Sequence, residues 1–180
     1  MRTTKTLMAA AAASLLALAA AGAHAQSANT QSYAGASLSS PHFDSNVAGV
    51  DASGTGISGK VYYGYRFTPN YSLELGLVDL GHMRDSVGEV KGWGGYVDGV
   101  GQWPVANSLS VIGRVGLTAA RFDTPLGHDS GPGYKVGAGL QYDINPSMAV
   151  VGEYEYYHYS GIQSSSANIG QFSVGLKVGF

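Results

Sequence analysis

Along the last ten residues of the chain, every second position is apolar: Phe172, Val174, Leu176, Val178 and Phe180. Glutamine, serine, glycine and lysine fill the positions between them. A period of two predicts a β-strand with one apolar and one polar face. At the edge of a soluble sheet such a strand would be prone to aggregation, whereas in a closed barrel it pairs with the first strand. The ending of the chain therefore favours a barrel.

The same alternation recurs in eight segments from residue 33 onward. Their lengths bracket the roughly 9–11 residues that a tilted strand needs to cross a lipid bilayer. The predicted strands cover residues 33–39, 57–67, 71–80, about 90–103, a stretch from 109, about 133–142, 148–159 and 171–180. The fourth is rich in glycine, and its two predicted faces are Trp93, Val97 and Trp103 against Tyr96, Asp98 and Gln102.

The predicted connections differ in length between the two ends of the strands. Short turns follow the second, fourth and sixth strands, at residues 68–70, 104–108 and 143–147. Longer loops follow the others, at about residues 40–56, 81–89, 122–132 and 160–168. Short turns at one end, long loops at the other and an even strand count are typical of outer-membrane barrels. The chain is therefore predicted to be all-β, an eight-stranded antiparallel up-and-down transmembrane β-barrel.

The positions of the charged residues indicate which face of each strand points outward. Most of them share the less apolar face with glycines, and inside a barrel of eight strands they can pair and fill the lumen. The predicted lumen charges are Lys60, Arg66, Glu74, Asp98, Arg114, Lys135, Glu153, Glu155 and Lys177. At the short-turn end, an interfacial girdle of aromatic residues is expected. Its members are Phe67, Tyr71, Trp103, Tyr142 and Phe180.

One contact inside the lumen can be predicted from the strand register. If the second and third strands pair around the 68–70 turn, Glu74 faces Gly64 and lies diagonal to Arg66. We expect an ion pair between Arg66 and Glu74, for which Gly64 leaves room. On that basis Arg66→Ala should destabilise the barrel more than Lys91→Ala at an exposed site.

The N-terminal residues have the form of a secretory signal peptide. Arg2 and Lys5 precede an apolar run, and Ala23-His24-Ala25 forms a cleavage site, so residues 1–25 are expected to be removed. The mature part, residues 26–180, is long enough for one domain. It has no cysteine, and without Arg2 and Lys5 the ten basic residues fall to eight against twelve acidic ones, a formal net charge of −4. This acidity argues against nucleic acid as a partner.

Three stretches of the sequence resemble the eight-stranded transmembrane domain of the OmpA-like outer-membrane proteins. They are residues 62–81, 109–116 and 173–180, and the resemblance covers essentially the whole mature chain. It implies location in the outer membrane. It also implies that the barrel-assembly machinery reads the terminal strand with Phe180, the assembly signal being Phe172, Val174, Leu176, Val178 and Phe180.

The sequence departs from the OmpA-like pattern in two places. Nothing follows Phe180, so the peptidoglycan-binding domain of full-length members is not expected. Val151 stands where relatives often carry a basic lumen residue, so the same internal salt-bridge network is not implied.

His158 and Ser160 lie near the outer end of the seventh strand, on its membrane-facing side. This His-x-Ser pair resembles the local sequence of the barrel enzyme lipid A 3-O-deacylase. A serine nucleophile needs a histidine base, and that histidine needs an orienting carboxylate. The nearest candidate on the eighth strand is Gln171, which is not a carboxylate. Rim residues near the membrane interface are the simpler interpretation, so no catalytic site is expected.

Neither a metal ion nor another cofactor is expected. The four mature histidines fall in or beside the predicted long loops, and none has a partner at ligand spacing on one element. They are His42, His82, His128 and His158.

Basic residues at the long-loop rim are candidates for contacts with lipopolysaccharide. If Trp103 pairs with Leu109, Lys91 falls opposite Arg121, and like charges directly opposed are unfavourable unless an anion lies between them. We expect Lys91 and Arg121 to clamp a phosphate of lipopolysaccharide, with Arg84 nearby. The alternative is that each side chain extends independently to the headgroups.

The sequence as a whole predicts a small integral outer-membrane barrel with a structural or surface-interaction role and at most a narrow pore. Its expected partners are outer-membrane lipid, lipopolysaccharide, the assembly machinery and an extracellular ligand of the long loops. Two alternatives remain open: a lipid A-modifying enzyme, and a soluble lipocalin-like carrier with apolar residues inside.

Overall fold

The computed structural model describes residues 31–43, 58–85, 88–124, 127–162 and 165–180 of the 180-residue chain. Of residues 41–43, 80–85, 88–92, 122–124, 127–130, 160–162 and 165–167, only the backbone is described. The predicted signal peptide lies outside these ranges. Within them the structure contains no helix long and apolar enough to cross a membrane.

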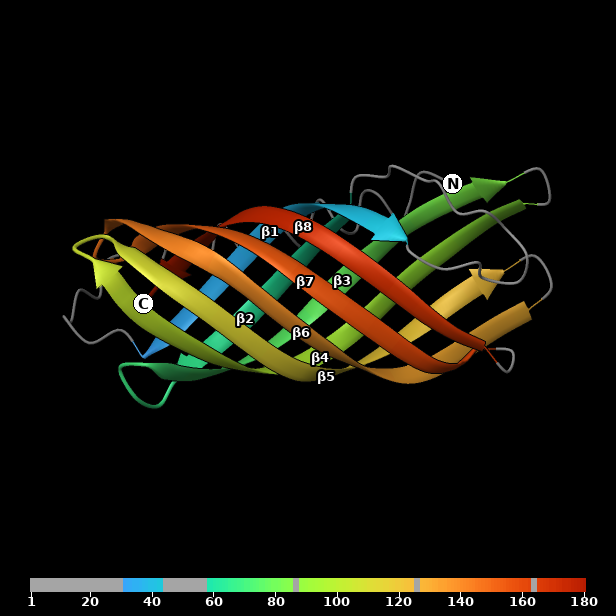
Figure 1. The fold of residues 1–180 in the computed structure, drawn as a ribbon, viewed down its shortest axis with the longest axis horizontal. Coiled ribbons are helices and arrows are strands. Elements are labelled where there is room, and N and C mark those ends of the chain that lie inside the picture. The colour runs from blue at the N-terminus through green and yellow to red at the C-terminus, as the bar shows by residue number, and fades with distance from the viewer. Residues whose placement is uncertain (1–30, 44–57, 86–87, 125–126, 163–164) are drawn as a thin grey trace.

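Eight antiparallel strands follow one another in chain order and close into a barrel, which confirms the predicted all-β architecture (Figure 1). The strands are β1 (Ser32–Phe43), β2 (Ser58–Arg66), β3 (Tyr71–Asp85), β4 (Gly88–Ala106), β5 (Leu109–Thr124), β6 (Gly127–Asn145), β7 (Met148–Ile162) and β8 (Ser165–Gly179).

The first and last strands close the barrel. Their register runs from Tyr33 opposite Gly179 to Phe43 opposite Ile169. Beyond it, the backbone N–H of Phe180 donates a hydrogen bond to the carbonyl oxygen of Ser32 at 2.9 Å. The terminal strand therefore has no unpaired edge, as a barrel in lipid requires, because an unpaired backbone group costs several kcal/mol there.

Most apolar side chains of the strands point outward, and most charged ones point inward. On β3, Leu75 is 54% exposed, whereas its neighbour Glu74 is 2% exposed. The glycine-rich β4 follows the same rule, with Trp93 exposed and Asp98 buried. An apolar exterior around a charged interior is the reverse of a soluble carrier, so the lipocalin-like alternative is wrong.

The strands are longer than the alternation predicted, and three of the four predicted long loops consist largely of paired strand. Residues in 81–89, 122–132 and 160–168 continue the ladders of β3–β4, β5–β6 and β7–β8. Beyond the bilayer both faces of a hairpin meet water, so the apolar period fades while backbone pairing continues. In the fourth predicted loop, 40–56, β1 extends to Phe43, and residues 44–57 lie outside the described ranges.

The turn after β4 is tighter than predicted, and this changes the register. β4 continues through Pro104 to Ala106, with a register shift between these two residues, so that Trp103 pairs with Val111 and not with Leu109. Proline lacks a backbone donor and is tolerated at such an irregularity near a strand end. A similar shift between Asp143 and Asn145 extends β6 into the segment predicted as a turn.

Glycines on the inner face make room for large inward side chains on the neighbouring strand. Tyr33 of β1 lies opposite Gly64 of β2, and a methyl group at Gly64 would overlap the Tyr33 ring. Asp98 of β4 lies opposite Gly116 of β5, where a methyl group would overlap both the Asp98 carboxylate and the Val97 carbonyl. The glycine content therefore reflects the packing of a narrow lumen, in which a bulky residue needs a small one across from it.

Candidate functional site

The middle of the lumen is filled by charged side chains that come from six of the eight strands. Each occupies an inward position and is buried by more than nine-tenths of its surface. They are Lys60 of β2, Glu74 of β3, Asp98 of β4, Arg114 of β5, Lys135 of β6, and Glu153 and Glu155 of β7. We call these seven side chains the lumen cluster.

Arg114 is the centre of the lumen cluster. Its Nη1 lies 2.7 Å from Glu74 Oε2 and 3.2 Å from Asp98 Oδ2. Its Nη2 pairs with Glu153, and its Nε lies 3.7 Å from Glu155 Oε1. One guanidinium thus contacts four carboxylates on three different strands, which uses the fork geometry that lysine lacks.

Two lysines complete the cluster by bridging the same carboxylates. Lys60 Nζ lies 2.6 Å from Glu153 Oε2 and 2.8 Å from Glu155 Oε2. Lys135 Nζ lies 2.8 Å from both Glu155 Oε1 and Asp98 Oδ2. Three cations therefore alternate with four carboxylates, so each buried charge has a direct partner of opposite sign.

Uncharged layers lie on both sides of the lumen cluster. Toward the extended hairpins, Tyr157 and Tyr159 are fully buried, and their rings stack 6.3 Å apart. Toward the short turns, Val100, Ile112 and Val151 form a small apolar cluster. Val151, whose position often carries a basic residue in OmpA-like proteins, thus belongs to an apolar layer of the lumen.

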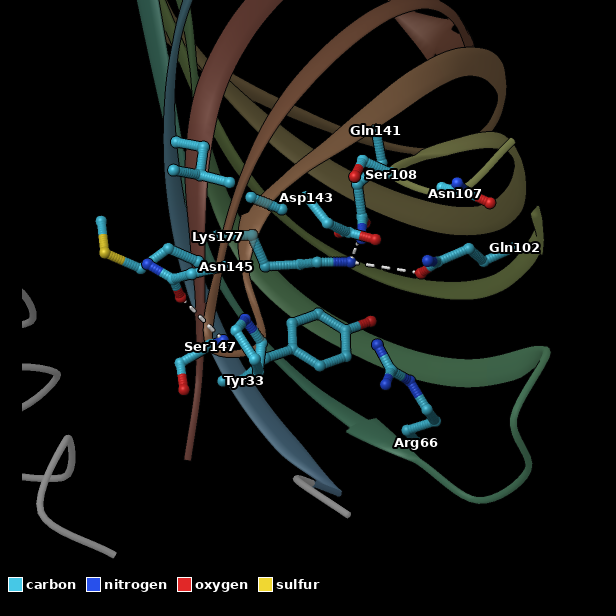
Figure 2. A pocket seen from close by; sticks show the side chains of 15 residues that line it. Tyr33, Arg66, Gln102, Asn107, Ser108, Gln141, Asp143, Asn145, Ser147 and Lys177 are labelled. Carbon is cyan, nitrogen blue, oxygen red and sulfur yellow. Dashed lines mark hydrogen bonds between the residues drawn. The ribbon is translucent and has the colours of Figure 1, made fainter. Parts of the chain in front are cut away.

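A cavity of about 390 Å³ opens at the short-turn end of the barrel (Figure 2). Its lining includes Arg66 and Lys177, which had been predicted as lumen charges. The predicted register around Glu74 is present, since Glu74 lies opposite Gly64. The predicted ion pair between Arg66 and Glu74 is wrong, because Glu74 pairs with Arg114 and accepts a hydrogen bond from the Tyr33 hydroxyl instead.

The sequence matches the family model described as "Outer membrane protein beta-barrel domain" over residues 10–180. The chain belongs to the outer-membrane β-barrel family. This membership confirms the predicted location in the outer membrane and agrees with the OmpA-like resemblance.

Solved structures of other outer-membrane proteins share the fold of this family member at low sequence identity. Neisserial surface protein A is 16% identical, with 83% of this chain and 97% of that chain covered and a TM-score of 0.65. The N-terminal barrel of Pseudomonas aeruginosa OprF is 14% identical, covering 82% and 98%, with a TM-score of 0.56. A major outer-membrane protein of Thermus thermophilus is 10% identical, covering 83% and 99%, with a TM-score of 0.57. No functionally curated protein matches the sequence.

The predicted lipopolysaccharide residues of this barrel lie at the rim of the extended hairpins, but not in the predicted arrangement. In the β4–β5 ladder Lys91 lies opposite Asp123, and Arg121 lies opposite Trp93, so Lys91 and Arg121 are not directly opposed. The prediction failed because the turn after β4 is shorter than predicted, so that Ala106 and not Trp103 lies opposite Leu109. The side chains of Arg84 and Lys91 lie outside the described part of the chain, whereas Arg121 is exposed.

The surroundings of His158 differ from those of a serine hydrolase. His158 Nδ1 lies 2.7 Å from Asn168 Oδ1 directly across the β7–β8 pair, and its ring packs against Tyr134 at 4.9 Å. Gln171 is fully buried and points into the lumen. The residue that orients His158 is therefore an amide, which lacks the negative charge of a triad carboxylate. The side chain of Ser160 lies outside the described ranges.

Among the described residues, no three histidine, cysteine, aspartate or glutamate side chains group together as a metal site would require. The side chains of His42, His82 and His128 are not among those residues.

Sequence reasoning did not identify two side chains that shape the lumen and its rim. Tyr33 separates the short-turn cavity from the lumen cluster, and Asn168 fixes the His158 ring. The inward position of Tyr33 could have been predicted, since Tyr33 lies on the face of β1 opposite to the outward residues Ala34, Ala36 and Leu38. Asn168 has no comparable signal, because it lies in a segment predicted as a loop.

Proposed function

We propose that this protein is a non-catalytic outer-membrane barrel with a structural role and an interaction role at the cell surface. The observation that supports this most directly is the lumen cluster, in which Arg114 and two lysines tie together carboxylates from three strands. A solute can pass only if several buried ion pairs separate, and leaving such charges unpaired costs several kcal/mol.

The outer surface offers better sites for function than the interior. β3 to β8 continue as paired hairpins beyond the segments that alternate. Outer-membrane barrels carry their longer connections on the extracellular side, so these hairpins would face the cell exterior. The structural neighbour from Neisseria is named a surface protein, which supports the same role here.

The rim below these hairpins is suited to lipopolysaccharide. Exposed Arg121 lies opposite exposed Trp93, and indole rings favour the membrane interface. Arg84 and Lys91 lie on the adjoining β3 and β4 segments, across from Glu89 and His82. Three basic residues on neighbouring strands would attract the phosphates of lipopolysaccharide, each through a charge-assisted hydrogen bond.

A conductance measurement tests the closed lumen. Purified protein in planar lipid bilayers should give no stable current steps of the size produced by a general-diffusion porin in the same bilayers. Because Arg114 and its carboxylates occupy the lumen, only small and infrequent ion leakage is expected. Regular porin-sized steps would contradict the proposal.

Binding of lipopolysaccharide tests the surface role. The double variant Lys91→Ala/Arg121→Ala should bind purified lipopolysaccharide in micelles at least about tenfold more weakly than the wild type, since hydrogen bonds to charged groups contribute about 1.5–3 kcal/mol each. The matched control is Arg66→Ala/Lys177→Ala, which removes the same charge at the opposite end of the barrel. Equal affinity in wild type and in the rim variant would refute the assignment.

A further inference from the structure

Two cations converge on one aromatic ring in the cavity at the short-turn end. Figure 2 shows Arg66 of β2 and Lys177 of β8 extending toward the space around the Tyr33 ring of β1. The guanidinium carbon of Arg66 lies 5.9 Å from the ring centroid, and Lys177 Nζ lies 4.8 Å from it. The ring therefore holds both cations near the same open space.

Neither cation is neutralised by a carboxylate among the described residues. Lys177 Nζ donates to the side-chain oxygens of Gln102 and Gln141, which are neutral amides. Arg66 forms no hydrogen bond and no ion pair with any other side chain that the structure describes; its contact is with the Tyr33 ring. Both side chains keep N–H donors for a partner that the described barrel does not supply.

The carboxylates nearest to this cavity have other partners. Glu74 lies beyond Tyr33, accepts a hydrogen bond from its hydroxyl at 2.8 Å, and is paired with Arg114. Asp143 lines the cavity, but its Oδ1 accepts a hydrogen bond at 2.6 Å from Gln141 Nε2. The described residues that line the cavity therefore include two positive side chains and one negative side chain, and the negative one forms no ion pair with Arg66 or Lys177.

We propose that this cavity is a binding site for a small organic molecule through its carboxylate group. The planar guanidinium of Arg66 matches a carboxylate in a two-pronged hydrogen bond, and the Lys177 ammonium adds a point charge beside it. A volume of about 390 Å³ falls within the range of small-molecule sites. Because short turns of such barrels face the periplasm, the ligand reaches the site from the periplasm.

Calorimetric titration of the folded mature chain in detergent at low ionic strength tests this site. The probes are N-acetylglycine, its neutral amide N-acetylglycinamide, and inorganic phosphate. N-acetylglycine is expected to bind with an affinity at least about tenfold higher than the amide, since the charge-assisted bonds require the carboxylate. The proposal would be overturned by equal affinity for acid and amide, or by tighter binding of phosphate. It would also be overturned if the acid gave no heat of binding at 10 mM, a dissociation constant that corresponds to a binding free energy of about −2.7 kcal/mol.

Three variants localise the binding to this cavity. Arg66→Gln and Lys177→Met should each weaken binding of N-acetylglycine about tenfold or more, because each removes one charged donor. Arg121→Gln, which removes a cation at the opposite end, should leave it unchanged. An affinity that falls equally in Arg121→Gln and Arg66→Gln would show that only the net charge matters and would overturn the site.

A gain of affinity separates the proposal from a defect in folding. Asp143→Asn removes the negative side chain found among the described lining residues and should strengthen binding of N-acetylglycine about two- to fivefold, because repulsion of the ligand is relieved. A misfolded variant could not bind more tightly. Unchanged or weaker binding by a variant with the gel mobility of the folded barrel would count against the proposed position of the carboxylate.

Discussion

Replacing Arg114 by methionine should lower the free energy of unfolding of the barrel by about 3–5 kcal/mol, the cost of removing one partner from a buried ion pair. The Arg114 side chain is 2% exposed and contacts Glu74, Asp98, Glu153 and Glu155. Without it, Lys60 and Lys135 are the remaining cations among four buried carboxylates. Because methionine fills similar space, the loss reports the charge and not a cavity.

Unfolding by urea in lipid vesicles measures this effect. Trp93 and Trp103, the two tryptophans of the chain, face outward and report the loss of the lipid environment by fluorescence. Arg121→Met is the matched control, because it removes the same group from an exposed position, where an ion pair contributes about 0–1 kcal/mol. Equal losses in the two variants would refute the structural role of Arg114.

A second substitution separates charge imbalance from loss of packing. Adding Glu74→Gln to Arg114→Met removes the carboxylate whose ion pair among the described residues is with Arg114 alone, so part of the stability should return. The two residues are in contact, so their effects are expected to be non-additive. A double variant that is less stable than Arg114→Met by the full cost of Glu74→Gln would indicate independent contributions.

The face of each strand could be predicted from the sequence because lipid meets one side of every strand. Leu75 and Val97 face the lipid and are apolar, whereas the charged Glu74 and Asp98 need polar or oppositely charged partners, which only the lumen offers. The alternation therefore assigned inward and outward positions even on the glycine-rich β4. The closure of β8 on β1 follows from the same requirement, because an open edge is not tolerated in lipid.

The partners of the lumen charges could not be predicted in the same way. Register arguments reach only neighbouring strands, and they paired Glu74 with Arg66 of the adjacent β2. In the structure Glu74 pairs with Arg114, which lies two strands away on β5 and reaches it across the lumen. Such contacts depend on the curvature of the closed barrel, which places side chains of non-adjacent strands within reach.

The rim was misjudged because the turn after β4 is shorter than predicted. The sequence suggested a turn over residues 104–108 with Trp103 opposite Leu109, whereas β4 continues to Ala106, which lies opposite Leu109. With the one-residue register shift between Pro104 and Ala106, Arg121 then lies opposite Trp93, and Lys91 lies opposite Asp123. Pro104 suggested the start of a turn, but proline is also tolerated at a bulge or near a strand end, so the sequence pattern alone does not show where β4 ends.

The orientation of the barrel wall predicts a further large effect, which comes from a charge placed in lipid. Leu176 is the central member of the five alternating apolar positions of the terminal strand and is exposed on the outer surface. Leu176→Arg should destabilise the barrel in lipid vesicles by about 2–4 kcal/mol, the cost of arginine near the bilayer midplane on the lipid face of such barrels. Leu176→Ala is the matched control, because it removes the same apolar contact without adding a charge. If arginine were tolerated as well as alanine, water and not lipid would surround this face, and the inward assignment of the lumen cluster would lose its physical basis.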